Sequence, residues 1–311
     1  MVKTARPVER RPLSRASASA SPLPDFVVIG AMKAGTTSLF HYLEAHPQIF
    51  MPSVKEADFF VEELNWSRGV DWYRRQFRGA GSALAVGEAS PAYTKYPLYA
   101  GVPERMASVI PRARLIYLVR DPIERIRSHY EHCVMVGTET RPIEEAVLED
   151  ARYLDCSRYG LQISRYLRHF PSEQVLIVRS EDLREQREET VRSIYRFLEI
   201  DDAVLPATLQ HEYYRTNDRE SYPAYVWWLR RNLKRIVPAR SRWRARRSVS
   251  LALERMSAVR QRLVGTHPSV SRPRAEITPE LRERLVEALR NDVNELRRHA
   301  SDSFDCWGIA A

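Results

Sequence analysis

The chain has 311 residues, 44% hydrophobic and 29% charged, with a formal net charge of +9. This length is ample for a buried core, and no apolar run approaches the length of a membrane span. The three cysteines, at positions 133, 156 and 306, form no C-x-x-C pair, so the sequence suggests neither a zinc site nor a disulfide framework, and we expect a reducing, cytoplasmic setting.

The positive charge is concentrated in two segments. Residues 1–24 carry +4 and residues 215–262 carry +11, which leaves about −6 for the rest of the chain. The first segment is rich in Arg, Ser and Pro and predicts a disordered basic arm. The second has apolar side chains at helical spacing beside Trp227 and Trp228, and predicts a basic helical insert at 215–265. Such an insert suits a membrane interface or an acidic partner, or it packs on the body with its basic face in solvent.

A strand–turn–helix motif near the start of the chain is the strongest signal. Residues 26–29 form a short apolar run that predicts a buried parallel strand, and residues 39–43 place apolar side chains at helical spacing. The turn between them is bounded by Gly30 and Gly35 and contains Lys33. Main-chain N–H groups of such a turn, together with the helix N-terminus, point at one place, where an anion is stabilised.

The glycine spacing is that of a nucleoside triphosphatase loop, but the lysine is not where such a loop needs it. Thr36 occupies the lysine position, and the lysine of the turn is Lys33. The second predicted strand carries no Asp motif for magnesium, so no metal site is predicted. With the hydroxyls of Thr36, Thr37 and Ser38, the turn predicts a phosphate-type anion site rather than one for ATP with magnesium. The alternative is an ordinary tight strand-to-helix connection.

Two glutamates are candidates for a general base. Glu56 lies in the run Lys-Glu-Ala-Asp-Phe-Phe at 55–60. These residues equally support a surface salt bridge beside two core phenylalanines, or a carboxylate near the anion loop with its pKa tuned by apolar neighbours. Glu88 follows a second predicted strand at 83–87, in a polar turn at the strand end, where α/β sheets usually bind ligands.

A second anion site is predicted after a third strand, at 114–119. Arg120 stands at the carboxyl end of this apolar strand, and Ser128 lies two turns along the helix that follows. An arginine fork with a hydroxyl can clamp a second phosphate. The alternative for Arg120 is an ion pair with Asp121 or Glu124.

The rest of the chain continues the alternation of strands and helices. Further helices are predicted at 69–77, 103–109, 142–152, 157–170, 190–198 and 279–298, with a fourth strand at 174–178. This alternation predicts an α/β fold with a central parallel sheet covered on both faces by helices.

Taken in order, these motifs resemble the sulfotransferase superfamily, nearest the branch of the heparan sulfate and carbohydrate sulfotransferases and their bacterial relatives. The motifs are Ile-Gly-Ala-Met-Lys-Ala-Gly-Thr-Thr-Ser at 29–38, the run at 55–60, Glu-Ala-Ser-Pro-Ala-Tyr at 88–93, and Leu-Val-Arg-Asp-Pro from 118 through Ser128. The resemblance covers about 25–200 and resumes near 272–307. It implies a three-layer, P-loop-like fold for a sulfotransferase domain at 25–311, with 215–265 as an insert or lid.

The resemblance also implies a donor, 3′-phosphoadenosine 5′-phosphosulfate (PAPS), whose product is adenosine 3′,5′-bisphosphate, and no metal. The groups that would hold the 5′-phosphosulfate are Lys33, Ala34, Gly35, Thr36, Thr37 and Ser38. Arg120 and Ser128 would hold the 3′-phosphate. Arg272 would also bind the nucleotide, and it is the one residue that matches a basic-Gly-Arg loop of the family. In this branch the glutamate matching Glu56 is the catalytic base. Lys33 would stabilise charge on the leaving 5′-phosphate.

The expected acceptor is a hydroxyl or amine on a glycan, a glycolipid or a related lipid-linked metabolite. Ala89 stands where the branch often has Lys, and Thr37 where some glycan enzymes have Arg, which argues against a heparan-type acceptor. Peripheral membrane contact through 215–262 is expected, and a nucleic-acid partner is not. The alternatives are a nucleoside triphosphate-dependent kinase, or a protein that binds anionic membranes or nucleic acid through 215–262.

Overall fold

The computed structural model of the chain describes residues 22–210, 274–300 and 304–309. Its centre is a five-stranded sheet in the order β2-β3-β1-β4-β5, in which every pairing is parallel. The strands are β1 (Phe26–Gly30), β2 (Ile49–Phe50), β3 (Ala85–Ala89), β4 (Arg114–Val119) and β5 (Val175–Arg179). The predicted α/β fold with a central parallel sheet is confirmed. The basic arm, the insert at 215–265 and Arg272 lie outside the described residues, apart from residues 22–24.

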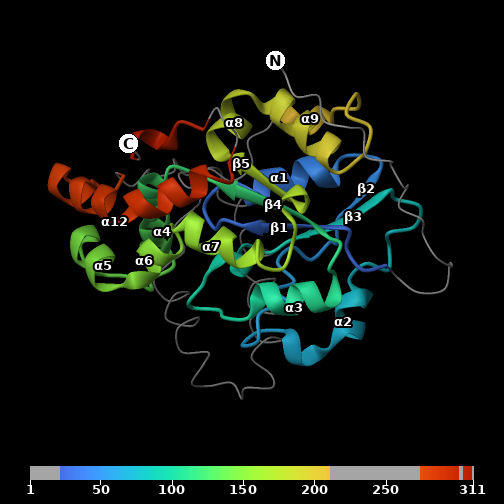
Figure 1. Cartoon of the computed structure of the whole chain (residues 1–311), viewed down its shortest axis with the longest axis horizontal. Coiled ribbons are helices and arrows are strands. Elements are labelled where there is room, and N and C mark those ends of the chain that lie inside the picture. The colour runs from blue at the N-terminus through green and yellow to red at the C-terminus, as the bar shows by residue number, and fades with distance from the viewer. Residues whose placement is uncertain (1–21, 211–273, 301–303, 310–311) are drawn as a thin grey trace, which may run out of the picture.

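Helices cover both faces of the sheet (Figure 1). They are α1 (Thr36–Glu44), α2 (Val70–Arg75), α3 (Val102–Val109), α4 (Pro122–Met135), α5 (Ile143–Glu149), α6 (Ala151–Asp155), α7 (Tyr159–Tyr166), α8 (Ser180–Glu185), α9 (Arg187–Phe197) and α12 (Pro279–Arg297). Figure 1 shows α1, α8 and α9 on one side of the sheet and α2 and α3 on the other. Across the ranges that the structure covers, no helix is both long enough and apolar enough to cross a membrane.

The central strands are buried on both faces, as parallel strands under two helical layers must be. All five residues of β1 are buried, and Phe26 pairs with Gly87 of β3. A Cβ atom built on Gly87 would lie 2.1 Å from Cζ of Phe26. The glycine therefore makes room for an aromatic ring on the neighbouring strand, and the two strands stay in register.

Several elements differ from the prediction, among them α8, which was not predicted. The helix expected at 142–152 is two helices, because Asp150 is extended and its side chain caps α6 by accepting a 3.0 Å hydrogen bond from the Arg152 amide. The short strand β2 was not predicted, since two residues leave no periodicity to detect. The second predicted strand lies two residues further on, at Ala85–Ala89, so Glu88 belongs to the strand and not to the turn after it.

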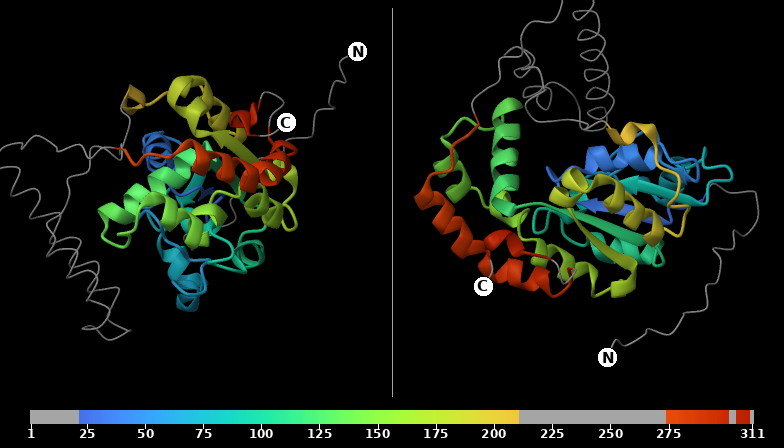
Figure 2. Two further views of the ribbon diagram at one scale, coloured as in Figure 1. Left: turned by 90° about the vertical axis from the view of Figure 1, so that its left-hand side faces the viewer. Right: turned by 90° about the horizontal axis from the view of Figure 1, so that it is seen from above.

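The C-terminal helix α12 packs along α7 and α4 (Figure 2). Asp292 of α12 accepts hydrogen bonds of 2.9 and 2.7 Å from the main-chain amides of Gly160 and Leu161 in the first turn of α7. Burial raises the pKa of Asp292 to about 6. These hydrogen bonds fix the second half of α12 against the first turn of α7.

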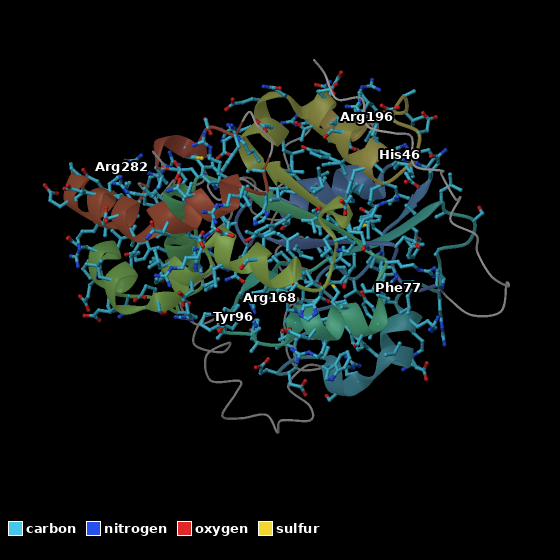
Figure 3. The ribbon with its side chains drawn as sticks, in the orientation of Figure 1. His46, Phe77, Tyr96, Arg168, Arg196 and Arg282 are labelled. Atoms are coloured by element: carbon cyan, nitrogen blue, oxygen red, sulfur yellow. The ribbon has the colours of Figure 1, made fainter. Side chains whose placement is uncertain are left out.

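His46, just after the end of α1, connects this helix to α9. Figure 3 places His46 near the end of α9, while Phe77 lies on the opposite side of the molecule, after α2. The His46 ring is 4.5 Å from that of Tyr195 in α9, and its Nε2 atom lies 2.9 Å from the carbonyl oxygen of Asp201. These contacts hold the C-terminal end of α1 against α9 and the segment that follows it.

Candidate active site

A cavity of about 760 Å³ lies at the carboxyl ends of the parallel strands. Its walls come from the segments that follow β1, β3, β4 and β5, at residues 32–38, 91–95, 120–132 and 180–187. The central strand β1 has β3 on one side and β4 on the other. Connections leave a sheet in opposite directions at such a point, and open α/β sheets bind their ligands in the crevice that results.

The loop after β1 forms one wall. Gly35 has φ +96° and Lys33 has φ +73°, a left-handed conformation that costs a non-glycine residue free energy. α1 begins at Thr36, so the amides of its first turn have no acceptor within the helix. The predicted residues that reach the cavity are Lys33, Gly35, Thr36, Thr37 and Ser38. Ala34 is fully buried outside the lining and its amide donates to the Ala31 carbonyl, so the structure does not bring its side chain to the site.

Arg120 and Ser128 line the same cavity, so the two predicted anion sites meet. Asp121 caps α4, because its Oδ1 atom accepts hydrogen bonds from the amides of Ile123 and Glu124 at 2.8 and 3.2 Å. The cap fixes the helix on which Ser128 is buried. The alternative for Arg120 is also observed, because its Nη2 atom lies 3.7 Å from a carboxylate oxygen of Glu124.

Glu56 reaches the cavity, and of the two alternatives that the sequence left open for its surroundings the salt bridge is the one observed. Its side chain is 51% exposed, and its Oε1 atom accepts a 2.6 Å hydrogen bond from Nζ of Lys55. Phe59 and Phe60 are fully buried and pack against Tyr73, as expected for core residues. Glu56 is therefore a salt-bridged residue and a cavity residue at once.

Asp58, near Glu56 in the sequence, lines the cavity, and burial changes the pKa of its carboxyl group. Its pKa is raised to about 7, first by burial and then by the negative charges of Glu56 and Glu88. Its Oδ1 atom is buried without a hydrogen-bond partner among the described residues, and the side chain lines the cavity. The Asp58 amide donates a 3.1 Å hydrogen bond to the Ser90 hydroxyl. Asp58 was not predicted as a site residue, although it stands two residues after Glu56 in the same motif.

Glu88 is not in the cavity lining, and the expectation that it faces a ligand is wrong. It is 1% exposed, and its carboxylate accepts hydrogen bonds from the hydroxyls of Tyr73, Tyr93 and Ser90 at 2.6, 2.8 and 3.1 Å. Burial raises the pKa of Glu88, and these hydrogen bonds oppose the rise. Because Ser90 and Tyr93 also accept the amides of Asp58 and Phe59, Glu88 anchors the wall that carries Glu56.

Several basic side chains of the lining were not predicted. They are Lys95, Arg127, Arg184, Arg187 and Arg274. Arg127 stands three residues after Glu124, and its place on the helix face was readable from the sequence. Arg274 lies 150 residues after Glu124, with which it pairs. In that segment the predicted site residue was Arg272. Among the described residues, no group of three or more His, Cys, Asp or Glu side chains is arranged to hold a metal ion.

Comparison with known proteins gives this geometry its context. Residues 23–230, about two thirds of the chain, match the family described as the sulfotransferase domain. The chain belongs to this family. The resemblance drawn from the motifs is confirmed, and the branch agrees, because the human bifunctional heparan sulfate N-deacetylase/N-sulfotransferase 2 is 30% identical over 199 residues. That match covers 57% of this chain and 22% of the human protein.

Other relatives of this sulfotransferase-family chain extend the comparison. The membrane-associated sulfotransferase kil1 of Dictyostelium discoideum is 39% identical over 115 residues, which cover 36% of this chain and 23% of that protein. The chain thus spans about a fifth of the length of the curated relatives it matches. The crystal structure of a sulfotransferase from Alicyclobacillus acidocaldarius superposes with a TM-score of 0.64 at 25% identity, covering 92% of this chain and 99% of that one.

Proposed function

We propose that the chain transfers a sulfonate group from PAPS to a hydroxyl or amine of an acceptor. The observation that carries this proposal is a single cavity that combines the loop after β1, the Arg120–Ser128 pair and the carboxylate of Glu56. Family membership supports the class of reaction. The donor, the roles of the residues and the acceptor are our proposal.

The residues present fit a nucleotide with two separate anionic groups. The loop offers a lysine, three hydroxyl side chains and the N-terminus of α1, which suit the 5′-phosphosulfate. Arg120 after β4 and Ser128 in α4 suit the 3′-phosphate, because a guanidinium presents parallel donors to phosphate oxygens. Arg272 stays a predicted ligand of the nucleotide outside the described residues.

In the proposed reaction a bond forms between the acceptor oxygen or nitrogen and sulfur, and the bond from sulfur to the 5′-phosphate oxygen breaks. Glu56 takes the acceptor proton, while Lys55 holds the carboxylate in place through its 2.6 Å hydrogen bond. Lys33 and the amides of the loop stabilise the negative charge that develops on the leaving phosphate. A sulfonate carries less charge than a terminal phosphate, so this chemistry does not require a metal ion.

The proposed acceptor is a glycan, a glycolipid or a related lipid-linked metabolite. One relative is named for heparan sulfate and another as membrane-associated. The cavity lining also includes the apolar side chains Leu64 and Tyr99 and the cation Lys95, which suit an acceptor with both apolar and polar parts. Membrane contact through 215–262 and a cytoplasmic location remain predictions from the sequence.

The experiment that tests the proposal is a transfer assay with PAPS. Two probe acceptors, 4-nitrophenol and a glucosamine oligosaccharide, are incubated with the wild type and with Lys33→Ala, and the sulfonated product is detected by mass spectrometry. We expect product with at least one acceptor from the wild type and a loss with Lys33→Ala. Arg196→Ala is the control, because it also removes one positive charge and Arg196 pairs with Glu189 and Asp202 outside the cavity lining. A chain that instead binds ATP with magnesium and phosphorylates an acceptor would contradict the proposal.

A further inference from the structure

Three arginines converge on the carboxylate of Glu124 in the first turn of α4. The Nη2 atom of Arg120, at the end of β4, lies 3.7 Å from Oε2 of Glu124, and the Nη2 atom of Arg274 lies 2.9 Å from it. Arg127, one turn further along α4, also pairs with this oxygen. All four side chains line the cavity. One part of the cavity thus holds three positive charges around one negative charge.

This cluster is arranged for an anion with more than one charge. A carboxylate and a phosphate present similar oxygen pairs to a guanidinium, so they compete for the same donors. Three members of the cluster are partly buried, since the side chains of Arg127, Arg120 and Glu124 are 15%, 22% and 29% exposed, whereas that of Arg274 is 58% exposed. A phosphate monoester carries up to two negative charges here against one on Glu124. The arginines therefore bind the dianion more strongly than the carboxylate, but the gain corresponds to only one additional negative charge.

We propose that Glu124 is a built-in competitor for the 3′-phosphate of the nucleotide. In the absence of nucleotide its carboxylate occupies Arg120 and Arg274, and the 3′-phosphate displaces it. Arg127 lies on the same helix and remains a partner for the displaced carboxylate. Glu124 thereby lowers the affinity for donor and product alike, and it favours release of the bisphosphate product, a step that limits turnover in many enzymes. This inference rests on the proposed function, because it requires a 3′-phosphate at Arg120.

The opposite role for Glu124 would be to hold the arginines in position for the nucleotide. The two roles predict opposite effects when the charge is removed. The main chain at Glu124 does not depend on its side chain, because Asp121 caps the helix and accepts the Glu124 amide at 3.2 Å. The Asp121 amide is held in turn by Glu181, at 3.0 Å. Glu124→Gln is therefore expected to fold normally, and it isolates the charge.

The test compares the affinities of adenosine 3′,5′-bisphosphate and of 5′-AMP, which lacks the 3′-phosphate, by titration calorimetry. Glu124→Gln should bind the bisphosphate about 3- to 30-fold more tightly than the wild type, given that part-exposed ion pairs contribute about 1 kcal/mol each. Its affinity for 5′-AMP should change by less than about twofold. Glu131→Gln is the matched control, because Glu131 lies two turns along the same helix, lines the same cavity and accepts the Ala275 amide at 3.1 Å.

Each result decides the matter. Tighter bisphosphate binding by Glu124→Gln, with 5′-AMP unchanged and Glu131→Gln close to wild type, supports the competitor. Weaker bisphosphate binding overturns it in favour of a positioning role, and unchanged binding overturns it without support for either role. Equal tightening of both nucleotides, or by both variants, overturns it in favour of a general charge effect. If the wild type does not bind the bisphosphate at all, the proposed donor is wrong and the inference fails with it, whereas the other outcomes leave the donor in place.

Discussion

The guanidinium of Arg120 donates a 3.3 Å hydrogen bond to the main-chain carbonyl oxygen of Lys33. Arg120 directly follows β4 and Lys33 belongs to the loop after β1, and these two strands are neighbours in the sheet. The two candidate phosphate sites are thus joined through one hydrogen bond at the sheet edge. A substitution at Arg120 therefore acts on the loop as well as on the second site, and its controls must separate charge from support.

Glu56→Gln should abolish most of the transfer activity while leaving nucleotide binding intact. Glutamine keeps the shape of the side chain but cannot take the acceptor proton, a role typically worth about 10²- to 10⁴-fold in rate. The measurement is bisphosphate release from PAPS with the better of the two probe acceptors. Glu62→Gln is the control, because Glu62 is 56% exposed and pairs with Arg105 outside the cavity lining. Turnover within about threefold of wild type in Glu56→Gln would exclude Glu56 as the base.

Glu88→Ala should lower the free energy of unfolding by roughly 3 kcal/mol or more, because three buried hydroxyl groups would lose their acceptor. Glu88→Gln should lose less, since the amide oxygen still accepts from the two tyrosines. The measurement is urea unfolding monitored by circular dichroism. An alanine variant as stable as the wild type would show that Glu88 does not anchor the wall.

Asp58 should make the protein less stable as the pH rises from about 4 to 7. Its pKa is about 7 in the folded chain against 3.8 in the unfolded one, so the unfolded chain loses the proton first. The folded state therefore binds more protons over this interval and loses relative stability, by up to about 4 kcal/mol. Asp58→Asn should remove this decline. Unfolding free energies at pH 4.5 and 7.5 measure it, and a variant with the same pH dependence as the wild type would refute the assignment.

The local parts of the fold and of the site were predictable from the sequence. The run at Phe26–Gly30 is apolar without interruption, which identifies a buried parallel strand, and the glycines and Lys33 that follow mark the anion loop. Arg120 and Ser128 were found for the same reason, because each lies next to a clear strand or helix signal. These features depend on residues close together in the chain.

The errors arose where distant residues decide the environment. Glu88 was misplaced because the strand ends two residues later than predicted, so its side chain is buried within the strand and does not stand in the turn that follows. Asp58 is buried by contacts with a segment about 32 residues away, and Arg274 reaches Glu124 across 150 residues. No periodicity within a short window reports such contacts.

The central claim is a nucleotide site with a second anion pocket at Arg120, and calorimetric binding tests it most directly. Adenosine 3′,5′-bisphosphate should bind the wild type, ATP with magnesium should bind weakly, and Arg120→Ala should weaken bisphosphate binding about 10- to 100-fold, the range for a charged hydrogen bond. Arg120→Lys should lie between the two, because it keeps the charge and loses the fork. Preferred binding of ATP with magnesium, or bisphosphate binding unaffected by Arg120→Ala, would contradict the account.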